Sequence, residues 1–142
     1  MKEISFVVRG NPMSQKRHRH TKRGHTYDPS SQDKQAFLMT VQAEAPSTPI
    51  DSPIAMDAVL YFPIPKSTPK YKKIEMEKGL YPMTKTPDAD NCGKFICDAL
   101  NGIFYLDDKL IYSLGVRKYY DAVPRTEVRL IYDIEREGKW NK

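Results

Sequence analysis

Alternating apolar residues in the middle of the chain place the strongest limit on its fold. In the stretch PIAMDAVLYFP, residues 53–63, every second position holds an apolar side chain: Ile54, Met56, Ala58, Leu60 and Phe62. Because side chains two residues apart on a strand point to the same side, this pattern predicts a strand with one core-facing side. The sheet that contains it must be covered on that face by another layer.

Further periodic segments indicate the fold class. Strands are predicted over 2–8, 109–120 and 126–134, and helices over 30–45 and about 90–101, with a short helix within 69–79. Ser30 is expected to cap the first helix. The short connection around Pro124 favours antiparallel pairing of the last two strands. We therefore expect an α+β fold, a mixed sheet of four to five strands with two main helices on one face.

Domain organisation is expected to be simple, with one domain spanning residues 1–142. Three segments fall outside the regular elements. They are a basic loop at 10–29, a connection rich in lysine and proline at 64–87, and a tail at 135–142 that is expected to fray.

Composition and charge limit the class of partner. The 142 residues carry a formal net charge of +5, and hydrophobic residues make up 39% of them. No apolar run is long enough to cross a membrane, and the N-terminus does not resemble a secretory signal, so we expect a cytoplasmic protein. A basic chain favours a polyanionic partner, nucleic acid before membrane, although a merely soluble basic protein would have the same composition.

Carboxylates gather in one short segment, TPDADNCGKFICDALNGIFYLDDK, residues 86–109. Asp90 is expected to cap the helix that follows, and Asp88 would point the same way on extended backbone. On a helical wheel Asp90, Lys94 and Asp98 share one face, and the apolar residues share the opposite face, which predicts an acidic outer side and a packed inner side.

A second acidic pair follows the same helix. Asn101-Gly102 is expected to end it, and the chain then turns to Asp107 and Asp108 at the start of the next strand. A helix of about 11 residues spans roughly 16 Å. This pair therefore reaches the Asp88–Asp90 end only if the next strand runs alongside the helix.

The carboxylates admit a functional and an ordinary interpretation. Oxygen ligands without neighbouring His or Cys ligands favour Mg²⁺ or Mn²⁺, which can activate water for phosphodiester hydrolysis, with Lys94 near the scissile phosphate. In the ordinary interpretation Asp90 is a helix cap, Lys94 and Asp98 form a surface pair, and the second acidic pair is a turn. A calcium loop is disfavoured because Cys92 and Ala99 hold two of its ligand positions.

These residues resemble the RusA family of Holliday junction resolvases, found in bacteria and prophages. The family pattern, roughly P-D-x-D-N-x-x-K, then D-A-L-N-G, then D-D, is present as Pro87 to Lys94, Asp98 to Gly102, and Asp107-Asp108. The likeness extends over about residues 3–134. Cys92-Gly93 departs from it, because an apolar pair is usual between the Asn and the Lys.

The resemblance implies a RusA-like fold and a Mg²⁺-dependent endonuclease, with Mn²⁺ as a substitute. The enzyme would act as a homodimer on four-way DNA junctions in recombination and repair. The resemblance assigns metal-binding carboxylates to Asp88, Asp90 and Asp108. It also assigns an essential lysine to Lys94 and a weaker metal role to Asp107. Each Asp→Asn change is expected to abolish cleavage while DNA binding is kept.

Basic residues outside the acidic segment are candidates for contact with DNA phosphates, which dominate affinity for nucleic acid. They are Lys16, Arg17, Arg19, Lys22 and Arg23 in the basic loop and Lys85 in the second connection. The alternative is a solvated loop. The three histidines of this loop are a weak zinc candidate, because the flanking cations oppose metal binding.

The resemblance leaves two rival functions open. The first is a nuclease of the same fold that cuts other branched DNA, such as flaps or forks. The second is a protein that binds DNA structure without cutting it, which the intact set of aspartates argues against. A homodimer is expected because two nicks at symmetry-related positions require two active sites related by a two-fold axis.

Overall fold

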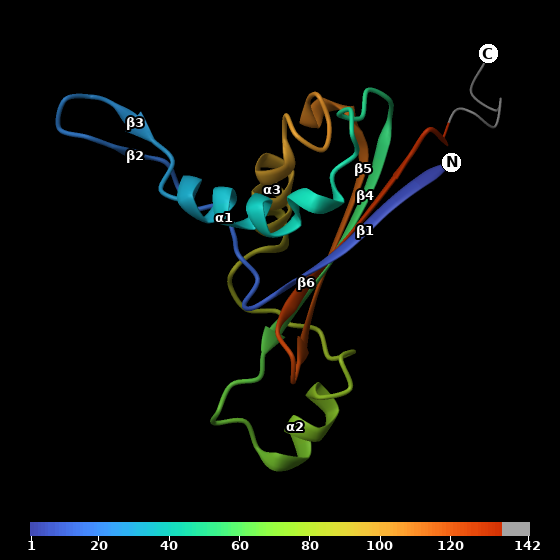
Figure 1. Cartoon of the computed structure of the whole chain (residues 1–142). Helices are drawn as coiled ribbons and strands as arrows, with labels where there is room; N and C mark the ends of the chain where they lie inside the picture. The colour runs from blue at the N-terminus through green and yellow to red at the C-terminus, as the bar shows by residue number, and fades with distance from the viewer. Residues whose placement is uncertain (135–142) are drawn as a thin grey trace.

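The strand predicted around Ala58 lies inside the sheet. In the computed structural model, which describes residues 1–134, β4 (Ile54–Pro63) pairs in parallel with β5 (Ile111–Asp121) and antiparallel with β6 (Arg125–Tyr132). On the far side of β6 lies β1 (Lys2–Arg9), also antiparallel, so the strand order is β1-β6-β4-β5 (Figure 1). The predicted tail at 135–142 lies outside the described residues.

The prediction that the last two strands pair with each other was wrong. β5 and β6 lie on opposite sides of β4, and the three residues between them, 122–124, cross its end. Neighbouring strands are about 4.8 Å apart, so the connection has to span roughly 10 Å, which three extended residues can reach. A short connection therefore did not require direct pairing.

Two helices cover one face of the sheet, as predicted. Helix α1 (Ser31–Val41) and helix α3 (Ala89–Leu100) lie on the same side of it (Figure 1). The alternating side chains of β4 are buried beneath them, and Phe37 of α1 meets both Phe6 of β1 and Phe95 of α3 edge-on. No helix within residues 1–134 is long and apolar enough to span a bilayer.

The first helix is shorter than predicted, and Ser30 does not cap it. The regular turns end at Val41, and a 3-10 turn, η1 (Gln42–Glu44), continues them. The Ser30 side chain makes no capping bond to α1. Instead its hydroxyl, fully buried, accepts a hydrogen bond of 2.9 Å from the backbone N–H of Lys16. Ser30 therefore joins the basic loop to the helix.

Two segments project from the sheet in different directions (Figure 1). The predicted loop at 10–29 contains a small antiparallel hairpin of β2 (Arg19–His20) and β3 (Thr26–Tyr27). Its turn includes Gly24, whose φ of +83° is a conformation that favours glycine. The lysine- and proline-rich connection carries helix α2 (Lys70–Met76) at the other end of the molecule. We call residues 16–27 the basic arm.

Candidate active site

The first acidic pair lies at the N-terminus of α3. Asp88, not Asp90, is the cap residue, with extended backbone (φ −69°, ψ 148°), and Asp90 lies in the first helical turn. The predictions that Asp90 caps the helix and that both residues are extended were therefore wrong, because the helix begins at Ala89. Asp88 and Asp90 are both exposed, and the Asp88 side chain makes no capping hydrogen bond. Their oxygens are thus open to solvent at a helix end whose dipole favours negative charge.

Lys118 of β5 holds the segment that leads into this helix. Its ammonium group donates hydrogen bonds to the carbonyl oxygens of Lys85, at 2.8 Å, and Pro87, at 2.7 Å. Backbone bonds join the same segment to β5, from the N–H of Met83 to the oxygen of Lys118 and from the N–H of Tyr120 to the oxygen of Tyr81. Lys118 therefore places a positive charge one residue before Asp88 and fixes the chain there.

Gly93 allows α3 to approach β5 closely. A side chain at this position would place its Cβ 3.0 Å from Cγ2 of Val116 and 3.3 Å from Cδ2 of Leu114. Contacts this short force the neighbouring side chains to move. The departure from an apolar residue at position 93 thus has a packing explanation. Cys92 beside it is fully buried, and burial raises the pKa of its thiol to about 11, as expected for an inert core cysteine.

Lys94 lies one turn after Asp90, exposed at the surface of α3. The ordinary interpretation expected it to pair with Asp98, but Asp98 pairs with Lys34 of α1 at 3.2 Å. No ion pair of Lys94 is found among residues 1–134. Its ammonium group is therefore available to a ligand near Asp90.

The second acidic pair lies beyond the C-terminus of α3. The helix ends at Leu100, and Gly102 follows with a φ of +86°, as the Asn101-Gly102 stop predicted. Asp107 then caps the 3-10 turn η2 (Asp108–Leu110) and accepts a hydrogen bond of 3.0 Å from the backbone N–H of Lys109. Burial, together with the neighbouring Asp107 and Asp98, raises the pKa of Asp108, so this end of α3 concentrates negative charge.

The structure does not bring the two acidic pairs together within one chain. They lie near opposite ends of α3, which has twelve residues and is about 18 Å long. The two cysteines of the helix lie near different acidic pairs. Besides burial, Asp88 and Asp90 raise the pKa of Cys92, whereas Asp98 and Asp108 raise that of Cys97. Within residues 1–134 no group of three or more His, Cys, Asp or Glu side chains is arranged to hold a metal ion.

A salt-bridge network links the acidic C-terminal half of α3 to the base of the basic arm. Lys34 donates to Asp28 at 2.6 Å and to Asp98 at 3.2 Å, and all three side chains are at least two-thirds buried. Burial alone would raise the pKa of Asp28, but hydrogen bonds from Lys34, the Ser30 N–H and Gln15 hold it well below its usual range. The C-terminal end of the basic arm is therefore held against α1 and α3.

The predicted DNA-contacting residues are all accessible. Lys16, Arg17, Arg19, Lys22 and Arg23 lie exposed along the basic arm, and Lys85 lies exposed three residues before Asp88. Five cations on one projecting segment form a surface of strong positive potential. His20 Nδ1 and Thr26 Oγ1, 2.9 Å apart, join the two strands of the arm.

Sequence reasoning missed two lysines that organise the site. The sequence pattern indicated only the period of the strand that carries Lys118 and of the helix that carries Lys34. Apart from Asp28, their partners are distant in sequence. Lys118 alone carried a signal, because it holds a core-facing position of β5, opposite Leu60. A charged residue at such a position needs a polar partner.

Comparison with known proteins identifies related chains. A family model described as endodeoxyribonuclease RusA matches residues 9–131. A curated relative, described as uncharacterized protein YqaN of Bacillus subtilis (strain 168), is 40% identical over 134 residues, which cover 89% of this chain and 94% of the relative. The matched region includes both acidic pairs, Lys94, Lys118 and the basic arm.

Proposed function

This chain belongs to the RusA endodeoxyribonuclease family, and from that premise we propose that it resolves four-way DNA junctions by paired symmetric nicks. The observation that carries the proposal is the N-terminal end of α3. Two exposed aspartates, Asp88 and Asp90, lie there, and one helical turn after Asp90 comes Lys94, which has no ion pair among the described residues. Anions left open beside a cation suit a site for a metal ion and a phosphate.

Asp88 and Asp90 would hold Mg²⁺, or Mn²⁺ in its place. The residues fit such an ion, because both are hard oxygen donors open to solvent and Mg²⁺ commonly takes only one or two carboxylates and keeps several waters. When bound, the ion supplies Lewis-acid polarisation of the phosphate and a water of lowered pKa.

The chain's own lysines do the remaining work in this proposal. Lys94 stabilises the negative charge that grows on the phosphate oxygens during hydrolysis. Lys118, bound to the carbonyl oxygens of Lys85 and Pro87, acts as a positioning residue that fixes Asp88.

A site that uses Asp108 as well must draw its carboxylates from two chains. About one helix length separates Asp108 from Asp88 and Asp90 in a single chain, and Asp107, the weaker candidate, lies with Asp108. We therefore propose a homodimer in which Asp88 and Asp90 of one subunit face Asp108 of the other. Two such sites related by a two-fold axis suit a substrate that is itself two-fold symmetric.

The basic arm supplies the DNA affinity in this proposal. Its cations, Lys16, Arg17, Arg19, Lys22 and Arg23, would follow the phosphate backbone of one junction arm, and Lys85 would contact phosphate beside the cleavage site. Such contacts read shape and charge rather than base sequence. Binding should therefore weaken steeply as the salt concentration rises.

The deciding experiment is cleavage of an end-labelled synthetic four-way junction, beside a matched duplex and a fork. Wild type and Asp90→Asn are compared in Mg²⁺ and in EDTA, with Asp33→Asn on α1 as a control for the loss of one carboxylate. We expect symmetric nicks near the crossover that require Mg²⁺. Asp90→Asn should lose them, and Asp33→Asn should keep them. Equal cleavage of fork and junction would instead indicate a nuclease for branched DNA in general, and binding without cleavage would indicate a structure-binding protein.

A further inference from the structure

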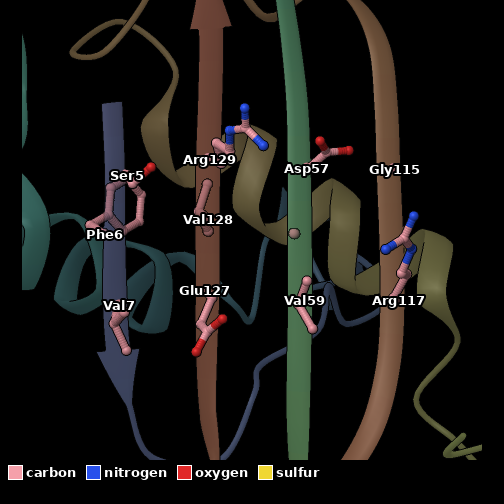
Figure 2. A pocket seen from close by; sticks show the side chains of 11 residues that line it. Ser5, Phe6, Val7, Asp57, Val59, Gly115, Arg117, Glu127, Val128 and Arg129 are labelled. Carbon is pink, nitrogen blue, oxygen red and sulfur yellow. The ribbon is translucent and has the colours of Figure 1, made fainter. Parts of the chain in front are cut away.

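Two hollows on the surface of the described residues differ in the charge that they present. One, of about 510 Å³, lies on the sheet face away from α3, and Figure 2 shows acidic and basic side chains interspersed along it. Asp57 and Glu127 there balance Arg117 and Arg129, so this hollow offers DNA no net attraction. The other, which we call the α2 hollow, lies between helix α2 and the C-terminal end of β5, in a basic part of the chain.

The segment that carries α2 is strongly basic. Residues 64–87 hold six lysines and two glutamates, a net charge of +4 in a chain that carries +5. Lys78 pairs with Glu75 at 3.1 Å. The lysines of this segment without an ion pair among residues 1–134 are Lys66, Lys70, Lys72, Lys73 and Lys85. A surface with this many free cations attracts the phosphates of nucleic acid.

Aromatic and apolar groups line the α2 hollow beside two of these lysines, Lys72 and Lys85. Its volume is about 270 Å³, slightly below the range of about 300–1,000 Å³ for sites of drug-sized ligands, so a single nucleobase suits it. The ring centres of Tyr81 and Tyr120 lie 6.1 Å apart. Tyr120 is only 6% exposed, whereas Tyr81 is half-buried and is the ring that a ligand can reach.

A cation lies over the accessible ring. The ammonium group of Lys72 is 5.8 Å from the centre of the Tyr81 ring. Proteins that bind single-stranded nucleic acid combine such parts, with aromatic rings on which bases stack and cations that follow the phosphates. The α2 hollow therefore has the chemistry of a site for an unpaired nucleotide.

Hydrogen bonds hold the tyrosine side of the α2 hollow in place. The backbone N–H of Tyr120 donates to the carbonyl oxygen of Tyr81 at 3.0 Å, and that of Met83 donates to the oxygen of Lys118 at 3.0 Å. These bonds join the chain before α3 to the edge of β5. Tyr81 is thus fixed before a ligand arrives, which lowers the free-energy cost of binding.

The α2 hollow lies close to the candidate active site. Lys85, which lines it, precedes Asp88 by three residues, a separation of at most roughly 10 Å. Lys118 binds the carbonyl oxygens of Lys85 and Pro87 and so fixes the chain between the two places. Phosphates of one DNA strand follow one another about every 3.4 Å along the helix axis. A base within about three nucleotides of a phosphate at Asp88 can therefore reach the hollow.

We propose that the α2 hollow binds one unpaired base of the DNA strand that is cut, stacked on Tyr81, while Lys72 and Lys85 contact the neighbouring phosphates. The inference rests on the proposed function and identifies a group that distinguishes a crossover from duplex. A base within continuous duplex has to be unpaired and unstacked before it enters the hollow. A base where strands exchange lacks a continuous stack on one side, so its release costs less.

An abasic scan of a synthetic four-way junction with a fixed crossover tests this arrangement. Bases near the crossover are removed one position at a time, and fluorescence anisotropy in EDTA, which prevents cleavage, gives each dissociation constant. For the wild type, removal of the base that enters the hollow should raise the dissociation constant about 5- to 30-fold. Removal of its neighbours should change the constant much less.

Tyr81→Ala removes the ring on which the base stacks. This variant should bind the intact junction about 5- to 30-fold more weakly than the wild type. It should lose no further affinity when the sensitive base is removed, because the ring and the base form one contact. Tyr81→Leu keeps apolar packing without a ring and should repeat this result, and Tyr81→Phe should match the wild type.

Tyr71→Ala is the matched control. Tyr71 is a second tyrosine of the same segment, 75% exposed on α2 and outside the lining of the α2 hollow, so its removal should leave the wild-type affinity and scan unchanged. Thermal unfolding followed by circular dichroism checks that each variant is folded. The scan of the wild type needs no substitution, so a scan without a sensitive position would overturn the proposal whatever the stability of the variants.

Cleavage of the intact junction and of a matched duplex by the wild type is measured in parallel, so that the two proposals fail separately. A wild type that cuts junctions, but whose scan has no sensitive position or is the same in Tyr81→Ala, would overturn the base-binding hollow alone. A wild type that has a sensitive position dependent on Tyr81, but never cuts a junction, would support the hollow and overturn the resolvase.

Discussion

The two ends of helix α3 carry the same residue type in opposite settings. At the N-terminal end, Asp88 and Asp90 are exposed, and the helix rests on β5 through Gly93 and Lys118. At the C-terminal end, Asp98 and Asp108 are half-buried, Asp98 is bound to Lys34, and Tyr105 donates a hydrogen bond of 2.7 Å to the carbonyl oxygen of Cys97. The N-terminal end is open to a ligand, whereas at the C-terminal end Asp98 is bound to the core and only Asp108 lacks an ion pair among residues 1–134.

This difference teaches where ionisable groups serve chemistry and where they serve structure. Exposed carboxylates at a helix N-terminus gain only the modest stabilisation that the helix dipole gives, and such a pair beside an unpaired lysine suits a binding role. Bound ones contribute to stability and lose it when a partner is removed. Each substitution below disturbs one end and should leave the other unchanged.

The largest expected effect comes from removing one carboxylate at each end. Asp90→Asn and Asp108→Asn should each lower the junction-cleavage rate at least about 10³-fold, roughly 4 kcal/mol of transition-state stabilisation. In an equal mixture of the two variants, a heterodimer would hold one site with both native carboxylates if each site spans two chains. Single-turnover cleavage should then recover toward about a quarter of the wild-type rate, because half of the dimers have one intact site of two.

The same mixture separates the alternatives. No recovery, with both variants inactive alone, would show that each site lies within one chain. An Asp108→Asn enzyme that keeps nearly full activity would remove the C-terminal end of α3 from the site altogether.

Gly93→Val tests the packing of the N-terminal end. The added side chain meets Val116 and Leu114, so we expect the free energy of unfolding to fall by about 2–3 kcal/mol. Gly93→Ala is the matched control. Its smaller contact is partly offset by the better helix propensity of alanine, which is worth up to about 1 kcal/mol, so its net change should stay within that amount. Urea denaturation measures both, and equal stability of all three proteins would contradict the close approach of α3 to β5.

Lys118→Met tests the positioning of Asp88. The carbonyl oxygens of Lys85 and Pro87 lose their donor, and displacement of the segment should lower the cleavage rate by about 10- to 100-fold. Affinity for the junction should change little, because Lys118 faces the protein. Lys109→Met, an exposed lysine in the turn before β5, is the control. A fall in affinity with an unchanged rate of bound-junction cleavage would mean that Lys118 contacts DNA directly.

Lys34→Met tests the fastening of the C-terminal end and has the smallest expected effect. Asp28 and Asp98 lose their shared cation, so we expect a loss of about 1–3 kcal/mol at neutral pH. The pKa of Asp28 is lowered in the folded protein. Its contribution is therefore complete above the unfolded value of about 4 and is lost as the pH falls below it toward the folded pKa. Urea denaturation between pH 7 and 3 should show wild type and variant converging in acid, whereas a constant difference would contradict this role of the ion pair.

The fold class followed from the sequence because hydrophobic period depends only on local spacing. The alternating apolar residues of β4 are buried as predicted. The apolar face of α3, which carries Cys92, Ile96 and Ala99, is buried too. Strand order did not follow, because the residues of 122–124 carry no information about which strand they cross. The cap of α3 was misplaced by two residues, since Asp88 and Asp90 are both suitable caps.

The candidate site was predictable in its residues but not in its assembly. Asp88, Asp90, Lys94 and Asp108 stand out by type and spacing, and their roles stay predictions. Their positions in space depend on the length of α3 and on the element that follows it. A local sequence pattern does not indicate how these elements pack. The two organising lysines, Lys34 and Lys118, were missed because each binds at least one group more than 30 residues away, which a local pattern does not indicate.

The place of β6 in the sheet has a consequence for synthesis of the chain. β6 lies between β1 and β4 and pairs with both, from Lys2 opposite Tyr132 to Tyr61 opposite Arg125. Until residues 125–132 leave the ribosome, β1 has no neighbour in the sheet, and until 111–121 do, β4 has none either. The sheet therefore closes only when nearly the whole chain has emerged, so a nascent chain halted before β6 exposes unpaired strand edges that invite aggregation.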